Sequence, residues 1–391
     1  MPAEWEPHEA TWLAWPHERT DWPGKFAPIP WVYGDIVQRL ARVEKVRILV
    51  EDAAVEKSAR RVLAKCGANM HAVEFFRHRT NRSWTRDYCP IFVRSSKGDV
   101  GITNWIFNGW AKYDNWRDDN RVPAFLTKRL KMRSFDPGIV LEGGSIDVNG
   151  RGLLLTTEEC LLSQTVQARN PGLGREELEQ YFVDFLGVRQ TIWLKKGIAG
   201  DDTHGHIDDL ARFVNLDTVV TVIEENRTEL NYEPLQENLS ILQKSGLRVA
   251  TLPMPAPVFF DGQRLPASYA NFYIANSLVL VPTFNDPVDR VALNVLAALF
   301  PDREVVGIYC GDLVLGLGAL HCMTMQQPAQ EPKSSTDPRQ LLDERKIQDP
   351  RTADFGFKQS HTRVLGDHSA DHASVLPIRH RSHSLQDCAR R

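Results

Sequence analysis

The most unusual polar stretch of the chain is "DDTHGHIDD" at residues 201–209, which places His204 and His206 among four aspartates. In an extended strand, residues two apart point to the same face, so a His-x-His pair suits a bound metal ion. The same pair beside carboxylates equally suits proton transfer next to a positively charged substrate. This stretch alone leaves both chemistries open.

Other polar residues whose side chains could take part in catalysis recur at intervals of roughly 60 residues. In chain order they are Asp87 in "SWTRDYCP", Glu142 in "VLEGGSI", His206 and Asp208 in "HGHIDD", Asn271 in "SYANF" and Cys322 in "GALHC". We expect a fold that brings these distant residues together to form one site.

The residue types of this set favour hydrolysis of a guanidinium group. A nucleophilic cysteine needs an acid–base partner, and Cys322 with His206 supplies this pair. Attack on a cation needs carboxylates to hold it, and Asp87 and Asp208 suit a planar guanidinium. Glu142 precedes two glycines, which let the backbone approach closely, and it is suited to orient the imidazole and raise its pKa.

The elements that would position these residues form a repeated unit. Two short apolar runs joined by a polar turn are followed by a helical pattern and a third apolar run. Copies span 90–142, where "GIVLE" is the third run, and 152–195, 211–254 and 271–310. The N-terminal part offers a strand in "ATWLAWP", a helix over 31–43, a strand in "VRILVE", a helix over 55–65 and a strand in "AVEFF". The N-terminal part completes a fifth copy if a strand near "LVLGLGALHCMTMQQP" pairs with the strand in "ATWLAWP".

Five copies of a unit that cannot bury its own sheet face predict a closed ring without free edges. Each candidate residue precedes a strand pair or follows the last strand of a copy, so one polar group per copy would converge on the axis. An ordinary open α/β sheet with accidental regularity is the alternative.

The composition narrows the class of protein. The chain has 391 residues and a formal net charge of -3, which gives no electrostatic reason to expect nucleic acid or an anionic membrane as partner. Because the sequence shows neither a long apolar run nor a signal-peptide pattern, we expect a cytoplasmic protein. Six scattered cysteines without a C-x-x-C pair indicate neither a disulfide framework nor a zinc knuckle. The polar segment 330–391 is predicted to be a disordered extension of a catalytic domain at 1–329, and a homo-oligomer is compatible with the sequence.

Several motifs together resemble the agmatine deiminase family, the bacterial peptidyl-arginine deiminase-like branch of the guanidine-modifying superfamily. They are "MPAEWEPHEATWLAWP", Trp84 to Pro90, "VLEGGSIDV", "LLTTEECLLS" with "RNPGL", "THGHIDDLARFV", "SYANFYIAN" and "HCMTMQQP". The resemblance covers about residues 1–329. It implies a five-bladed pseudosymmetric α/β propeller (pentein fold), a small-molecule guanidine substrate, and no metal or other cofactor.

The resemblance also implies a role for each matched residue. Cys322 attacks the guanidinium carbon to form a covalent intermediate, and Asp87 and Asp208 hold the nitrogens. His206, supported by Glu142, protonates the departing ammonia and then activates water. We therefore expect acid–base catalysis at "HGH", and the resemblance implies hydrolysis of agmatine to N-carbamoylputrescine and ammonia.

Alternatives remain open at the sequence level. They are deimination of peptidyl or free arginine, an amidinotransferase, and a metal-dependent amidohydrolase built on His204 and His206. Arg82 in "RTNRSW" departs from the family pattern, and a basic residue there would favour a substrate with a carboxylate at its other end.

Neighbouring residues are open to more than one interpretation. Trp84 and Trp110 are interpreted as walls of the substrate pocket with a cation–π contribution. Asn271 either holds a substrate end or satisfies backbone groups. His321 is predicted to point to the far face of a strand, in a packing role, and His204 is a candidate for substrate contact.

Overall fold

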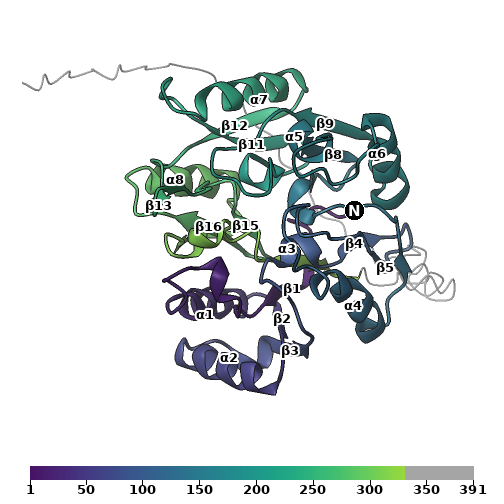
Figure 1. Cartoon of the computed structure of the whole chain (residues 1–391), viewed down its shortest axis with the longest axis vertical. Helices are drawn as coiled ribbons and strands as arrows, with labels where there is room; N and C mark the ends of the chain where they lie inside the picture. Colours follow the sequence, from purple (N-terminus) through teal and green to yellow (C-terminus); the bar gives the residue numbers. More distant parts are fainter. Residues whose placement is uncertain (331–391) are drawn as a thin grey trace, which may run out of the picture. The chain divides into compact units, whose positions relative to one another are not determined.

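The computed structural model describes residues 1–330 (Figure 1). Beyond Gln330, the predicted disordered extension lies outside the described residues. Of the helices described here, none combines the length and apolar character needed to span a membrane.

Four three-stranded sheets share one strand order, in which an antiparallel pair is followed by a parallel strand. The sheets are β4 (Ile91–Arg94), β5 (Val100–Thr103) and β6 (Ser134–Phe135); β7 (Asp147–Val148), β8 (Leu153–Thr157) and β9 (Gln190–Leu194); β10 (Ala211–Phe213), β11 (Thr218–Ile223) and β12 (Arg248–Pro253); and β15 (Tyr273–Ile274), β16 (Leu278–Thr283) and β17 (Glu304–Tyr309). The helices that connect the parallel strands are α4 (Val122–Leu130), α6 (Arg175–Tyr181), α7 (Tyr232–Lys244) and α8 (Asp289–Leu299). A short hairpin of β13 (Phe259–Phe260) and β14 (Gln263–Arg264) precedes the last of these sheets.

A fifth sheet joins the two ends of the described chain. Its order is β18 (Met325–Pro328), β1 (His8–Ala14), β2 (Lys45–Val50) and β3 (Val73–Arg77), with β18 antiparallel to β1 and the others parallel. The connecting helices are α1 (Ile29–Leu40) and α2 (Ala53–Lys65). The predicted pairing of a strand before the tail with the N-terminal strand is therefore confirmed.

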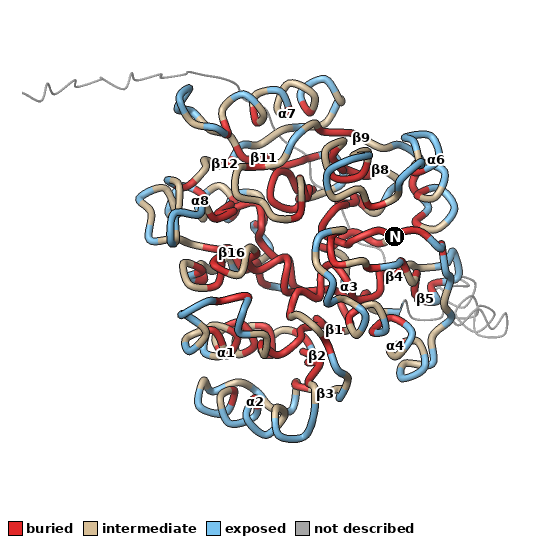
Figure 2. The backbone as a smooth tube through the Cα atoms, viewed as in Figure 1, coloured by how far each residue is buried: buried red, intermediate tan, exposed pale blue. Residues whose placement is uncertain are grey.

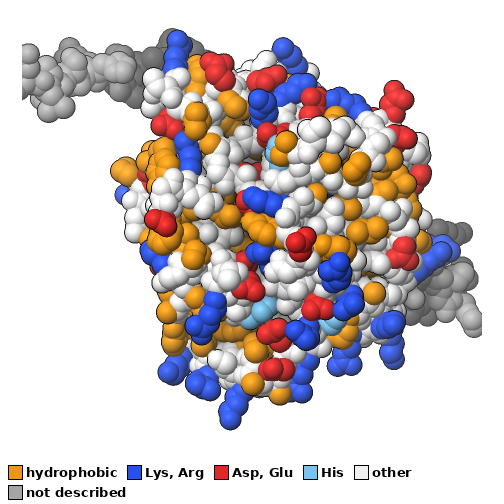
Figure 3. Space-filling view, in the orientation of Figure 1, with side chains coloured by type: hydrophobic (Ala, Val, Ile, Leu, Met, Phe, Trp, Pro, Cys, Tyr) orange, Lys and Arg blue, Asp and Glu red, His pale blue; other side chains and the backbone are white. Residues whose placement is uncertain are grey.

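Local sequence explains why these elements form. The carboxylate of Asp52 accepts hydrogen bonds from the first amides of α2, at Ala54 and Val55, and so caps the helix. In β11 the run "TVVTVI" is almost entirely buried, which is typical of a strand covered on both faces. Figure 2 shows buried residues concentrated in the strands and exposed residues on the helices. Acidic and basic side chains are intermixed over the face drawn in Figure 3, as the small net charge suggests.

One predicted strand is wrong. "GIVLE" does not form the third strand of the 90–142 copy, because Ser134–Phe135 takes that place as β6 beside β5. Within the predicted segment, Val140 makes a single bridge to Ile106. The chain leaves the sheet early and reaches Glu142 in an extended conformation.

The candidate site residues lie in short helices and turns rather than in strands. Asp87 is in the short helix α3 (Thr85–Tyr88), and Glu142 precedes the 3-10 turn η4 (Gly143–Ser145). His206 precedes η6 (Ile207–Asp209), which contains Asp208, and Cys322 lies in the segment before β18. Contacts of η4 with both α3 and η6 bring these turns side by side.

Candidate active site

The five residues predicted to act on the guanidinium form one buried cluster. Nδ1 of His206 lies 3.8 Å from Oδ1 of Asp87 and 3.9 Å from Oδ1 of Asp208. Nε2 of the same ring lies 3.9 Å from Oε2 of Glu142. Sγ of Cys322 lies 3.8 Å from Oδ2 of Asp208. The turns from four separate segments therefore place a thiol, an imidazole and three carboxylates together.

The second glycine of "EGG" is required by this close packing. A Cβ atom at Gly144 would lie 2.6 Å from Nδ1 of His206 and 2.7 Å from Oδ1 of Asp87. The Gly144 amide also donates a hydrogen bond of 3.1 Å to Asp87. A larger residue would occupy the space in which the acid and the imidazole meet.

The electrostatics of the cluster favour a charged imidazole. Burial lowers the pKa of His206, but Asp87, Cys160 and Glu142 raise it well above its usual value. Burial opposes ionisation of Glu142, yet the guanidinium of Arg169, whose Nε donates to Oε1 at 2.9 Å, brings the carboxyl pKa to about 2. His206 is therefore positively charged near neutral pH, and Glu142 is an anion.

The pKa values of Asp87 and Cys322 are raised, which favours the neutral form of both groups. Burial, only partly offset by His206, raises the pKa of Asp87 to about 6, with Asp208 and Glu142 adding to the shift. Burial and the charges of Asp208, Asp209 and Asp87 raise the pKa of Cys322 well above its usual value. A bound cation would favour the ionised form of both groups.

A pocket of about 810 Å³ opens onto Cys322 and Asp87. Trp84 and Trp110 line it, as predicted, and Nε1 of Trp110 donates a hydrogen bond of 2.9 Å to Oδ2 of Asp87. Phe260, Asp261 and Gln263 of the β13–β14 hairpin also line the pocket, together with Thr20, Asp21, Pro23, Arg82, Tyr113, Asp202, Thr203, Leu315, Gly316 and Leu317. The pocket therefore combines aromatic walls with several acids.

Arg82 lines this pocket, but its charge is already compensated. Its guanidinium pairs with Asp21 and lies 4.2 Å from the ring centroid of Tyr113. Asp202, further along the wall, accepts a hydrogen bond of 2.6 Å from the Tyr113 hydroxyl and pairs with Lys112.

Asn271 contacts Cys322 and is not among the residues that line the pocket. Its Nδ2 lies 3.1 Å from Sγ of Cys322 and 3.0 Å from Oδ1 of Asp209. Its Oδ1 accepts hydrogen bonds from the amides of His321 and Cys322, at 3.0 and 3.4 Å. Of the two interpretations of Asn271, the satisfaction of backbone groups is the one that the geometry matches.

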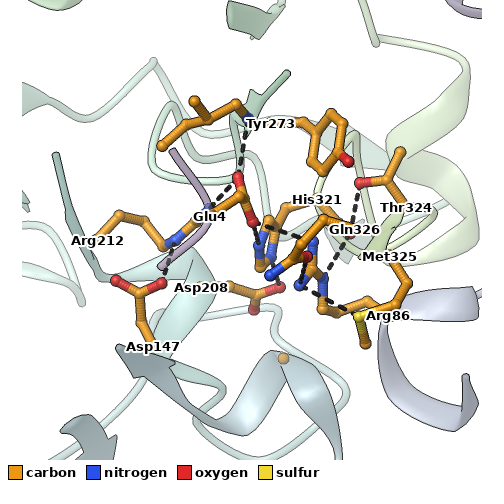
Figure 4. A network of polar contacts seen from close by, with 12 residues as sticks. Glu4, Arg86, Asp147, Asp208, Arg212, Tyr273, His321, Thr324, Met325 and Gln326 are labelled. Atoms are coloured by element: carbon orange, nitrogen blue, oxygen red, sulfur yellow. Dashed lines mark hydrogen bonds and ion pairs between the residues drawn. The ribbon is translucent and has the colours of Figure 1, made fainter. Parts of the chain in front are cut away.

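His321 lies between Asp208 and Glu4, and sequence reasoning missed this arrangement (Figure 4). Nδ1 lies 2.7 Å from Oδ2 of Asp208, and Nε2 lies 2.8 Å from Oε2 of Glu4. The prediction that His321 sits on the far face of a strand is wrong, because the residue is in a turn before β18. A ring with a carboxylate at each nitrogen donates to both when it is protonated, which holds Asp208 in place.

Glu4 at the N-terminus is the second residue that sequence reasoning missed. It accepts hydrogen bonds from Arg86 at 3.1 Å and from the Ile274 amide at 2.8 Å, and it pairs with Arg212 at 2.9 Å (Figure 4). Arg86 and Arg212 are thus both engaged by Glu4. The only available signal was the position of Glu4 within the motif "MPAEWEPH".

His204 does not share a face with His206. Residues 201–206 form turns rather than a strand, and His204 has a φ of 65°. Its Nδ1 lies 4.0 Å from Oε1 of Glu159, beside a different hollow that is lined by Lys196 and Leu230. The His-x-His pair is therefore not arranged to hold one metal ion between its two rings.

Comparisons with known proteins find a matching family and several similar proteins. Residues 1–328 match the model of the family described as Porphyromonas-type peptidyl-arginine deiminase. An agmatine deiminase of Pseudomonas aeruginosa (strain LESB58) is 35% identical over 361 residues, covering 84% of this chain and 95% of that protein. Two solved structures each have a TM-score of 0.78 and 30% identity, covering 85% of this chain and 96% of theirs. One is a C. jejuni agmatine deiminase with a cysteine-to-serine change and substrate bound, and the other is the agmatine deiminase of Enterococcus faecalis.

Proposed function

Because the chain belongs to the Porphyromonas-type peptidyl-arginine deiminase family and has agmatine deiminases among its relatives, we propose that it is a hydrolase that converts agmatine to N-carbamoylputrescine and ammonia. The observation that carries this proposal is the position of Cys322 in a pocket together with Asp87, and 3.8 Å from Asp208. A nucleophile flanked by two carboxylates matches a guanidinium carbon with its nitrogens.

In the first half of the reaction, a covalent bond forms between Sγ of Cys322 and the guanidinium carbon. When the guanidinium binds between Asp87 and Asp208, its charge favours loss of the Cys322 proton to solvent. The thiolate adds to the guanidinium carbon, and a C–S bond forms. The His206 imidazolium donates a proton to the departing nitrogen, the C–N bond breaks, and ammonia leaves a cationic thiouronium on Cys322.

The second half of the reaction releases the product. Neutral His206 takes a proton from water, and the resulting hydroxide adds to the same carbon. The C–S bond breaks, the Cys322 thiolate is restored, and the ureido product leaves after losing its extra proton to solvent. Glu142 stays anionic and stabilises the imidazolium in both halves.

The charge of the pocket supports agmatine over arginine. Its lining includes four acids and one basic residue, Arg82. Arg82 pairs with Asp21 and Lys112 pairs with Asp202, which leaves Asp87 and Asp261 without a Lys or Arg partner among the described residues. A substrate with a positive charge at each end is attracted to such a pocket, whereas the carboxylate of arginine is repelled. The expectation that Arg82 selects a carboxylate is not supported by this environment.

The arrangement of the sheets belongs to the same proposal. We infer that the five sheets form a five-bladed pseudosymmetric propeller with the active site at its centre. The shared strand order, the pairing of β18 with β1, and the meeting of turns at His206 support this arrangement. An experimental structure tests it, and an open sheet with a free edge would contradict it.

A substrate panel tests the reaction. The purified chain is incubated with agmatine, free arginine or an arginine-containing peptide, and ureido groups are detected colorimetrically. We expect kcat/KM for agmatine to exceed that for the other two substrates. Preferential turnover of arginine or the peptide would overturn the substrate assignment, and failure of all three would overturn the reaction.

A further inference from the structure

A second buried thiol lies beside the catalytic imidazole. Cys160 belongs to the short helix α5 (Glu158–Leu161) and is fully buried. A ligand atom from each of Cys160, His206 and Glu142 lies within 4.8 Å of the other two. Sulfur, imidazole nitrogen and carboxylate oxygen are the donor types that bind zinc in proteins.

Two of these three residues have a donor atom with unused hydrogen-bonding capacity. Nε2 of His206 and Oε2 of Glu142 are buried and lack a hydrogen-bond partner among the described residues. They lie 3.9 Å apart, close to the separation of about 3.3–3.8 Å between ligands of a tetrahedral zinc ion. Buried polar atoms of this kind are normally satisfied, so their convergence points to a ligand.

The surroundings of the three residues suit a cation. Arg169 donates to the other oxygen of Glu142, which orients the carboxylate as an outer-shell residue orients a metal ligand. On the opposite side of the ring, Asp87 and Asp208 lie 3.8 and 3.9 Å from Nδ1 of His206. These carboxylates add negative charge around the imidazole.

We propose that Glu142, Cys160 and His206 form an inhibitory binding site for a thiophilic divalent cation, with Zn²⁺ as the best match. A metal on Nε2 of His206 occupies the lone pair that carries the second proton of the imidazolium, so the ring can no longer donate a proton to the departing nitrogen from Nδ1, which faces Asp87 and Asp208. The inhibitory effect rests on the proposed function, whereas binding of the metal does not. Asp87, which lies 3.8 Å from Nδ1 of His206, lines the pocket that admits substrate.

A second group, Asp208, Asp209 and Cys322, also has donor atoms within 4.8 Å of one another. Most of its donor atoms are engaged: Oδ2 of Asp208 contacts His321, and Asn271 donates to Asp209 and to Cys322, whereas Oδ1 of Asp208 lacks a partner among the described residues. The experiment must therefore separate a metal held by Cys160 from one held by Cys322.

Cobalt(II) serves as a spectroscopic probe of the thiol ligand in the full chain carrying Cys322→Ser. We expect thiolate-to-cobalt charge-transfer absorption that Zn²⁺ abolishes by displacement. The absorption is expected to disappear in Cys160→Ser/Cys322→Ser and to persist in the matched control Cys310→Ser/Cys322→Ser, since Cys310 is a buried thiol outside the cluster. Absence of the band in the single variant, or its survival without Cys160, would overturn the site.

Inhibition supplies a second readout. Zn²⁺ is expected to inhibit agmatine turnover by the unmodified chain, and Cys160→Ser should raise the inhibitory concentration at least about tenfold, measured against the uninhibited rate of that variant. Equal sensitivity of the two proteins would overturn the inhibitory role. If Cys160→Ser fails to fold, Cys160→Ala replaces it. Should the chain lack deiminase activity, the cobalt spectra still decide whether the metal site exists.

Discussion

Replacing Trp110 with phenylalanine tests how the pocket tunes the acid that holds the substrate. The Trp110 N–H donates to Oδ2 of Asp87 at 2.9 Å, which favours the ionised carboxylate. Burial raises the pKa of Asp87 to about 6, and this hydrogen bond limits that rise. Since only the carboxylate grips a guanidinium, kcat/KM falls as the pH drops below about 6.

The size of the effect follows from the energy of the lost bond. A hydrogen bond to a charged group contributes about 1.5–3 kcal/mol. At about 1.4 kcal/mol per pKa unit, its loss moves the acidic limb of the pH profile upward by about 1–2 units. Asp87 keeps the amide of Gly144 as a donor, which places the expected shift at the lower end.

The assay is the pH dependence of kcat/KM for agmatine in the unmodified chain and in Trp110→Phe. Trp22→Phe is the matched control, because Trp22 is buried beside Trp84, at 5.5 Å between ring centroids, and its N–H donates to Leu313 instead. We expect the acidic limb to move only in Trp110→Phe. An unmoved limb in a folded Trp110→Phe protein would refute the account of how Asp87 is tuned.

Three further predictions concern the support of the cluster. His321→Gln breaks a buried pair with Asp208 and is expected to lower the free energy of unfolding by about 3 kcal/mol and to raise KM for agmatine; an unchanged denaturation midpoint and KM would contradict this. Gly144→Ala places a Cβ atom 2.6 Å from His206 and is expected to reduce kcat far more than stability, which parallel kinetics and melting curves measure. Because the pKa of Glu142 is lowered to about 2, this carboxylate stabilises the fold above its unfolded pKa, and that contribution is lost as the pH falls toward about 2. Denaturation at several pH values should therefore show a smaller acid-dependent loss of stability in Glu142→Gln than in the unmodified chain.

Much of the fold could be predicted from local patterns. The copies at 211–254 and 271–310 correspond closely to β10–β12 and β15–β17, because their strands are apolar runs bounded by turns and their helices are amphipathic. The third strand of the copy at 90–142 was predicted in the wrong place, because the strand that forms there has only two residues, Ser134 and Phe135. A strand that short carries no readable periodicity.

The residues of the candidate site could be predicted from the sequence, but the contacts that hold them in place could not. Reactive residue types in motifs identified Cys322 and His206. The contact between His321 and Glu4 joins residues 317 positions apart, and no local pattern encodes it. His204 was misplaced because the two-residue period of a strand was applied to a segment that forms turns, where side-chain directions do not alternate.

The central claim is that Cys322 forms a covalent bond to the guanidine carbon. Rapid acid quenching during agmatine turnover, followed by peptide mass spectrometry, measures it directly. We expect an amidino adduct on the peptide that contains Cys322, with neither adduct nor ureido product in Cys322→Ser. Continued production of the ureido product by Cys322→Ser would contradict it.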